Sequence, residues 1–153
     1  MFKKNNSFMI QAIKEANKSK VKGDWPVGCV IIIDGKIVAT GRNKVYSQSN
    51  KILHAEIDAM LKIPELLSRR GKDATMYVTY EPCPMCLGAI ILNHIKKVVC
   101  GTNVDKSGAF GMIESLPSRF NEDKYLFKFE TGFMESECRD VFMAGDPVKK
   151  LKL

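Results

Sequence analysis

The sequence predicts a single α/β domain, because apolar β-branched runs alternate with segments of helical periodicity. The chain has 153 residues, the length of one domain with one core, and residues 145–153 are expected to form a loose tail. A content of 45% hydrophobic and 27% charged residues fits an ordinary soluble globular protein. After Thr75 strands alternate with helices, so crossover connections and some parallel strand pairing are expected.

The predicted strands share apolar or β-branched runs bounded by turn residues: 27–33, 36–41, 74–79, 97–101 and 124–129. The predicted helices share apolar residues three and four positions apart: 8–22, 54–63, 82–93 and 135–143. Asn6 and Ser7 can cap the first helix, on which Glu15 is expected to face water. Asp34-Gly35 predicts a two-residue hairpin turn, and Pro64 is expected to end or bend the second helix.

The net charge of +7 suits a polyanionic partner, although scattered lysines also describe an ordinary solvated surface. No apolar run reaches the roughly 20 residues that a membrane-spanning helix needs, and the start of the chain lacks the apolar region of a secretory signal. Five cysteines are an odd number, and two of them stand at metal-binding spacing. These features favour a reducing, cytoplasmic location over a disulfide framework.

The candidate metal ligands are His54 and the C-x-x-C pair formed by Cys83 and Cys86. Zinc favours thiolate sulfur and imidazole nitrogen, and three such ligands leave one tetrahedral position open for water, as in a catalytic site. His54 opens one predicted helix and the two cysteines lie at the start of another, so both helix N-termini are expected to point at the metal. The sequence therefore predicts one zinc ion per chain.

Glu56 stands two residues after His54, so its side chain points in a different direction along the helix. A carboxylate beside a metal-activated water can move protons, and Glu56 is the predicted general acid and base. The alternative is a structural zinc closed by a fourth side chain. The candidates for that fourth ligand are Cys29, Cys100, Cys138 and His94, and none has ligand spacing to the other three.

The pattern of His54-Ala55-Glu56 followed by Pro82-Cys83-Pro84-Met85-Cys86 resembles the cytidine deaminase-like superfamily, whose zinc nucleobase deaminases carry H-x-E and P-C-x-x-C. The similarity covers residues 8–143 and is greatest to the branch of tRNA adenosine, cytosine and guanine deaminases. It implies a three-layer α/β/α sandwich around a five-stranded mixed sheet, and a homodimer whose interface helps to build the pocket.

The resemblance also implies roles beside the metal. Glu81 matches a residue that supports the site from behind the ligands, although by itself it could be a surface carboxylate. Asn43 matches an asparagine that binds the substrate base, and the backbone N–H of Ala55 is a candidate donor to the base. Val27 and Trp25 are expected to line the pocket, with core or dimer contacts as the alternative for Trp25.

Three segments resemble tRNA adenosine deaminases in particular: Asp24-Trp25-Pro26-Val27-Gly28-Cys29, Asp105-Lys106-Ser107-Gly108-Ala109, and the run from Glu130 to Cys138. One segment departs from them. Those enzymes usually read D/N-P-T-A before H-A-E, whereas this chain has Asn50-Lys51-Ile52-Leu53, and cytosine deaminases carry a leucine at the last of these positions.

Three hypotheses follow. The first is hydrolytic deamination of a tRNA wobble adenosine to inosine, with the anticodon loop held by basic side chains and the base flipped out. The second is a deaminase of a free base, nucleoside or nucleotide of cytosine, guanine or cytidine type. The third is a zinc-binding scaffold without turnover.

Overall fold

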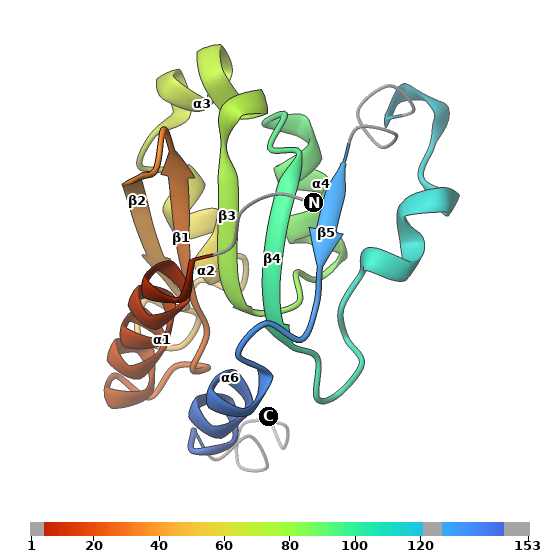
Figure 1. The fold of residues 1–153 in the computed structure, drawn as a ribbon. Helices are drawn as coiled ribbons and strands as arrows, with labels where there is room; N and C mark the ends of the chain where they lie inside the picture. The colour runs from red at the N-terminus through yellow and green to blue at the C-terminus, as the bar shows by residue number, and fades with distance from the viewer. Residues whose placement is uncertain (1–4, 121–126, 146–153) are drawn as a thin grey trace.

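The computed structural model describes residues 5–120 and 127–145 (Figure 1). Its longer elements are α1 (Asn6–Val21), β1 (Gly28–Ile33), β2 (Lys36–Arg42), α2 (Ala55–Met60), α3 (Pro64–Arg70), β3 (Thr75–Tyr80), α4 (Pro84–Leu92), β4 (Lys97–Thr102), β5 (Lys128–Glu130) and α6 (Glu135–Met143). Short 3-10 turns span Gly71–Asp73, Phe110–Ser115 and Ser118–Phe120.

The strands form one mixed sheet in the order β2-β1-β3-β4-β5. β1 pairs antiparallel with β2 and β3, whereas β3, β4 and β5 run parallel. The parallel half arises because α4 connects β3 to β4 and carries the chain back across the sheet. The predicted five-stranded mixed sheet is thereby confirmed.

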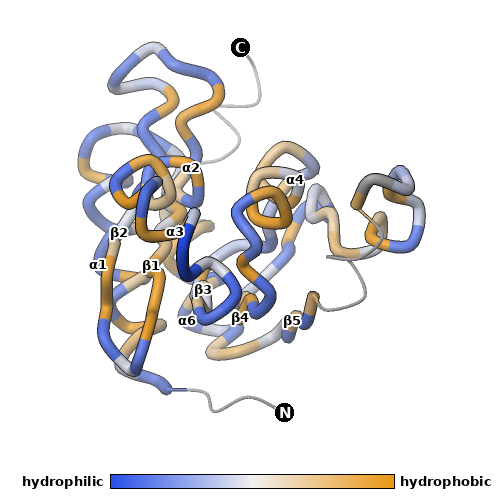
Figure 2. The backbone as a smooth tube through the Cα atoms, turned by 90° about the horizontal axis from the view of Figure 1, so that it is seen from above, coloured by the Kyte–Doolittle hydropathy of each residue, from blue (hydrophilic) through white to orange (hydrophobic). Residues whose placement is uncertain are grey.

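Helices cover both faces of the sheet and make it the middle of three layers. α1 and α6 pack on one face, and α2 and α4 pack on the other (Figure 1). Side chains of β1 alternate between these layers, with Ile31 in the cluster beneath α2 and α4, and Val30 in the cluster beneath α1. β1 is therefore buried along its whole length, which explains its unbroken apolar sequence. Figure 2 shows the same apolar character along α4.

The hairpin between β1 and β2 has the predicted two-residue turn. Asp34 and Gly35 both have positive φ, 51° and 71°, as a type I′ turn requires. This turn suits the right-handed twist of the sheet and fixes the pairing of Ile33 with Lys36. A shift of register between Ile31 and Ile32 then pairs Gly28 with Arg42 at the other end of the hairpin.

Two predictions about α1 are wrong. The cap is Asn5 rather than Asn6 or Ser7, and its side-chain oxygen accepts a hydrogen bond from the Ser7 backbone N–H at 2.9 Å. Glu15 does not face water but is 4% exposed. Its carboxylate accepts hydrogen bonds from Lys18 at 2.6 Å and from Gln11 at 3.3 Å, which offsets the cost of its burial.

Other differences concern the ends of elements. The second predicted helix is α2, which ends at Met60, and Pro64 begins a separate helix, α3, that the periodicity did not predict. A proline suits a first helical turn because the N–H it lacks would have no partner there. The predicted fifth strand, 124–129, is confirmed at Lys128 and Phe129, and β5 continues to Glu130. Phe127 precedes the strand, and residues 121–126 lie outside the described part. The predicted tail also lies beyond it, except for Gly145. Among the described residues no helix is long and apolar enough to cross a membrane.

The contact between α2 and β2 sets the position of the helix that follows His54. A Cβ atom built on Gly41 would lie 2.1 Å from the Ala55 carbonyl oxygen and 2.6 Å from the Ala59 nitrogen. Both are backbone atoms and cannot rotate away, so α2 reaches this close approach only because residue 41 has no side chain.

We therefore expect Gly41→Ala to lower the free energy of unfolding by about 1–3 kcal/mol, because the methyl group pushes α2 off the sheet. The matched control is Gly111→Ala in the 3-10 turn Phe110–Ser115, where a Cβ meets nothing within 4 Å. That change should raise the free energy of unfolding by about 0.4–1 kcal/mol, because alanine restricts the unfolded chain more than glycine does. Urea denaturation of both variants measures the difference, and equal stabilities would contradict the close approach.

Candidate metal centre and substrate pocket

The N-termini of α2 and α4 meet on the face of the sheet that these helices cover, and the predicted ligands lie at these N-termini. His54 is the N-cap of α2, Cys83 is the N-cap of α4, and Cys86 lies in the first turn of α4. His54 Nδ1 is 3.6 Å from Cys83 Sγ and 3.7 Å from Cys86 Sγ. The three ligand atoms all lie within 4.8 Å of one another, which is the spread expected around a single zinc ion with Zn–N and Zn–S bonds of about 2.0–2.3 Å.

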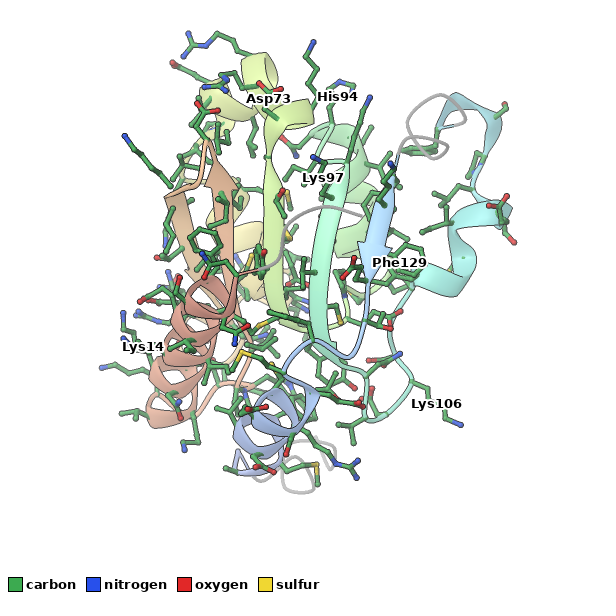
Figure 3. All side chains as sticks on the ribbon, in the orientation of Figure 1. Lys14, Asp73, His94, Lys97, Lys106 and Phe129 are labelled. Atoms are coloured by element: carbon green, nitrogen blue, oxygen red, sulfur yellow. The ribbon has the colours of Figure 1, made fainter. Side chains whose placement is uncertain are left out.

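The donor set fits a zinc site with an open position. Among the described residues, the group of possible ligands holds these three and no fourth. Cys29, Cys100 and Cys138 are buried free thiols outside it. His94 follows the end of α4, and Figure 3 shows it at the opposite end of the molecule from Lys106, in a left-handed conformation with φ of 59°. None of the four candidates for a fourth ligand belongs to the group, so the structure does not support a structural zinc closed by a fourth side chain.

The two thiols differ in acidity because they share a hydrogen bond. Hydrogen bonds from Cys86 and His54 lower the pKa of the Cys83 thiol to about 4. The same contact with Cys83, together with burial, raises the pKa of Cys86. The hydrogen bond to Cys83 likewise raises the pKa of His54. The pair thus presents one ready thiolate and one thiol whose proton must leave when a metal binds.

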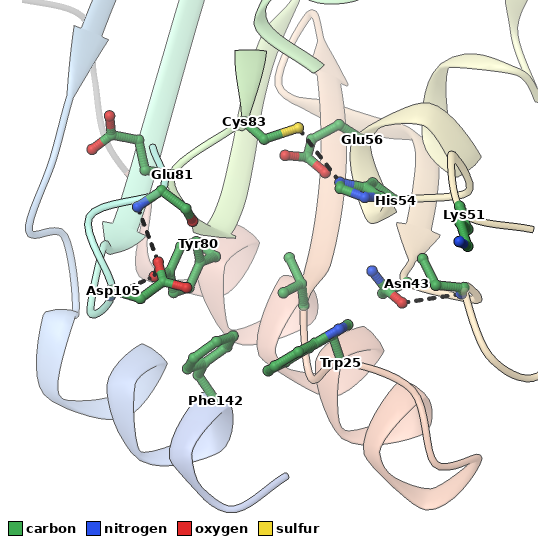
Figure 4. A pocket seen from close by; sticks show the side chains of 13 residues that line it. Trp25, Asn43, Lys51, His54, Glu56, Tyr80, Glu81, Cys83, Asp105 and Phe142 are labelled. Atoms are coloured by element: carbon green, nitrogen blue, oxygen red, sulfur yellow. Dashed lines mark hydrogen bonds between the residues drawn. The ribbon is translucent and has the colours of Figure 1, made fainter. Parts of the chain in front are cut away.

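Glu56 projects from α2 into the space beside these ligands (Figure 4). Its side chain is nearly excluded from solvent, with 3% of the residue exposed, and this burial raises its pKa to about 7. A carboxyl group with a pKa near neutrality can both accept and return a proton at physiological pH. This is the property that the predicted general acid and base needs.

A pocket with a volume of ≈ 210 Å³ opens next to the ligands. The residues that line it come from six stretches of the chain: Trp25, Val27, Asn43, Val45, Lys51, His54, Glu56, Tyr80, Glu81, Cys83, Asp105, Ser107 and Phe142. Val27, Asn43 and Trp25 therefore lie where they were predicted. Ala55 is fully buried and does not line the pocket, so the role of its backbone N–H stays a prediction.

Asn43 is held in a defined orientation. The Asn43 side-chain oxygen accepts a hydrogen bond from the Val45 backbone N–H at 3.1 Å. The Asn43 backbone N–H donates to the Val27 carbonyl at 3.1 Å. The Ser19 hydroxyl donates to the Asn43 backbone carbonyl at 2.8 Å. With the oxygen engaged, the side-chain NH₂ is the group left to face the pocket as a donor (Figure 4).

Glu81 directly follows β3 and hydrogen-bonds to the segment after β4. Its two carboxylate oxygens accept hydrogen bonds from the Phe110 backbone N–H at 3.0 Å and from Asn103 Nδ2 at 3.2 Å. A Cβ atom on Gly108 would lie 2.3 Å from the Glu81 carboxyl carbon, so this loop closes tightly over the carboxylate. Glu81 is thus partly buried in a network rather than a free surface charge, and its link to catalysis stays a prediction.

The aromatic wall of the pocket was not predicted beyond Trp25. The Phe142 ring from α6 stacks on Trp25 with centroids 5.6 Å apart and an interplanar angle of 11°, and it lies 4.5 Å from the Tyr80 ring. The Tyr80 hydroxyl donates to Asp105, and burial raises the pKa of Tyr80 to about 12. The sequence signal for Asp105 was its segment resemblance, whereas no local pattern marked Phe142.

Removing one ligand should empty the metal site. We expect His54→Ala and Cys86→Ser each to lower the zinc content well below about one ion per chain, since a zinc site rarely tolerates two protein ligands. Mass spectrometry of the purified proteins measures the metal. The control is Cys100→Ala, which removes a buried thiol outside the ligand group and should keep the zinc. Full zinc content in both ligand variants would contradict the assignment.

Comparison with known proteins agrees with this geometry. The family described as "Cytidine and deoxycytidylate deaminase zinc-binding region" matches residues 2–102. The tRNA-specific adenosine deaminase of Bacillus subtilis is 39% identical over 143 residues, which cover 90% of this chain and 85% of that enzyme. The enzyme of the same name from Streptococcus pyogenes serotype M1 is 36% identical over 154 residues, covering 94% of this chain and 86% of that one.

Solved structures give the same result. One from a study of A-to-I editing by tRNA:A34 deaminases has a TM-score of 0.74 and 29% identity, and the match covers 90% of this chain and 99% of that chain. The guanine deaminase of Nitrosomonas europaea has a TM-score of 0.72 at 19% identity, over 95% of this chain and 87% of that one, which shows the shared fold. The chain therefore belongs to the cytidine and deoxycytidylate deaminase family of zinc-binding enzymes, which remove an amino group by hydrolysing a carbon–nitrogen bond.

Proposed function

We propose that this enzyme converts adenosine to inosine at the wobble position of a tRNA anticodon loop. The observation that carries the proposal is the 39% identity to a tRNA-specific adenosine deaminase over 90% of the chain. The pocket supports it, because it combines a carboxyl group, a neutral amide donor and a flat aromatic wall, which suit a flipped-out base. The net charge of +7 suits an RNA partner.

In this proposal His54, Cys83 and Cys86 hold the zinc, and Glu56 carries the protons. Zinc held by these residues would supply a Lewis acid, which would make water a better nucleophile near neutral pH. Glu56 accepts one proton from the attacking water and passes it to the ring nitrogen next to the amino-bearing carbon. It then moves the remaining hydroxyl proton to the amino group. The carbon–nitrogen bond breaks, ammonia leaves, and a carbonyl oxygen takes its place.

The pocket walls orient the base for this reaction. The side-chain NH₂ of Asn43 donates to an acceptor on the base, and the Ala55 N–H is a second proposed donor. Val27 and the paired rings of Trp25 and Phe142 contact the flat faces of the base. Glu81 supports the pocket from its far side through the loop that it holds. Correct placement of the base beside Glu56 is the main contribution of these residues.

The departure at residues 50–53 does not favour a free-base substrate. Leu53, which matches a leucine of cytosine deaminases, is 9% exposed and does not line the pocket. Of these four residues, Lys51 alone reaches the pocket wall. The shape of the base-binding space therefore does not depend on the leucine.

We also propose that the enzyme acts as a homodimer in the cytoplasm. Leu61 at the end of α2 is 65% exposed and Leu92 on α4 is 56% exposed, although both are large apolar side chains. Met85, seven residues before Leu92, shares one face of α4 with it and is also exposed. A second copy covering this outer face would remove that apolar surface from water. The cytoplasm suits the free thiols of the chain, because it keeps them reduced.

A substrate panel tests the reaction. We expect the wild-type enzyme to release ammonia from tRNA and to form inosine there, and to release far less from adenosine, adenine, guanine, cytosine or cytidine. Glu56→Gln should keep its zinc, because it leaves all three ligands in place, and should lose about 10²–10⁴-fold in kcat. Release from a free base alone would overturn the tRNA assignment, and near-normal turnover by Glu56→Gln would exclude its role.

A second test addresses assembly. Sedimentation should give twice the chain mass of 17.2 kDa for the wild-type protein. Leu61→Glu combined with Leu92→Glu places two charges on the proposed interface, and we expect it to yield the single-chain mass. Val21→Glu is the matched control, since Val21 is 81% exposed on α1 at the other face of the sheet. A dimer that withstands the double change would exclude this surface.

A further inference from the structure

The pocket wall is electrically asymmetric. Three carboxyl groups line it, from Glu56, Glu81 and Asp105, whereas Lys51 is the one lysine or arginine among its lining residues. Figure 4 places Lys51 on the side of His54 and Asn43, across the pocket from Asp105 and Glu81. An anionic part of a substrate would therefore be repelled at one side of the opening and attracted at the other.

The backbone around Lys51 is anchored at several points. The Asn50 N–H donates to the Val45 carbonyl at 3.0 Å, and the Lys44 N–H donates to the Leu53 carbonyl at 3.0 Å. The Asn50 side-chain oxygen accepts from the Ile52 N–H at 3.2 Å. Lys51 thus starts from a fixed position at the pocket edge, so little backbone entropy is lost when it binds a ligand.

The carbonyl and the ammonium of Lys51 have separate roles. The carbonyl lies on the backbone next to His54 and helps to raise the pKa of its ring. The ammonium has no ion-pair partner among the described residues. Lys44 and Lys62 differ in this respect, since both pair with Asp58, at 2.7 and 3.2 Å. Lys51 is therefore available to an external anion.

We infer that Lys51 forms a phosphate-binding subsite at the mouth of the pocket and selects phosphate-bearing nucleotides over free bases. This inference rests on the proposed function and extends it to the substrate backbone. A nucleotide whose base lies between Asn43 and the Trp25 ring leaves its sugar and phosphates toward the opening, within reach of the long Lys51 side chain on the pocket wall. A lysine ammonium binds phosphate as a point charge and needs no fixed hydrogen-bond geometry.

The test uses an RNA hairpin with adenosine at the first anticodon position, and three variants. Lys51→Gln removes the charge but leaves the backbone next to His54 and all three candidate ligands unchanged, so its zinc content should equal that of the wild type. Lys51→Arg keeps the charge. Lys36→Gln removes an exposed lysine beside the hairpin turn, at the end of the sheet away from the pocket, and is the matched control (Figure 1).

We expect Lys51→Gln to raise both the Kd and the KM for this RNA about tenfold while kcat stays within about twofold. It should also reduce the salt dependence of binding by about one phosphate contact, a change of roughly 0.7 in the slope of log K against log salt. Lys51→Arg should stay within about threefold of the wild type. If Lys51→Gln behaves like Lys36→Gln in affinity and in salt slope, the RNA arm counts against the inference.

Competition by adenosine 5′-monophosphate and by adenosine distinguishes the two sources of phosphate. If Lys51→Gln weakens RNA binding alone, the subsite takes a backbone phosphate of a polymer. If it also weakens the monophosphate relative to adenosine, the subsite takes the phosphate of the bound nucleotide itself. If Lys51→Gln binds both the RNA and the monophosphate as tightly as the wild type does, the inference is overturned. If Lys51-dependent RNA binding occurs without inosine formation, the proposed reaction fails and the subsite stands.

Discussion

The structure depends on the meeting of two helix starts at one point behind the sheet. His54 and Cys83 are 29 positions apart in the sequence, and their ligand atoms lie 3.6 Å apart. The approach of α2 to β2 at Gly41 fixes one of these residues, and the turn from β3 into α4 fixes the other. Both supports are backbone packing and so hold these residues close together, and the N-terminus of α4 favours the thiolate there.

The pocket lies beside the N-termini of α2 and α4, and loops form the rest of its wall. The buried Asp24 carboxylate accepts hydrogen bonds from the Tyr46 N–H at 2.7 Å and the Ser47 N–H at 2.9 Å, and so holds the segment that follows β2. On the other side, Glu81 and Asp105 bond to the loop after β4. A buried carboxylate is costly unless its hydrogen bonds are satisfied, so the contacts of Asp24, which is 1% exposed, fix the conformation of its loop strongly.

Burial also gives the site its chemistry. Desolvation raises the pKa of Glu56 to about 7, so this carboxyl group can exchange protons near neutrality. Cys83 shows the opposite effect, since hydrogen bonds from Cys86 and His54 outweigh desolvation and lower its pKa to about 4. One small volume therefore holds a carboxyl group with a raised pKa and a thiol with a lowered pKa, each tuned by its neighbours rather than by its residue type.

The sequence by itself predicted the grouping of the three candidate ligands, the place of Glu56 beside them, the hairpin turn and the last helix. Each is encoded by residues close together in the chain or by a fixed spacing. It was wrong about the cap of α1 and the exposure of Glu15, and it did not predict α3, where capping and packing decide between neighbouring choices. Only the tertiary structure decided that Phe142 stacks on Trp25 and that Lys51 lines the pocket. Contacts of this kind join side chains from separate elements, and no local pattern records them, because they exist only once the sheet has set where each element ends.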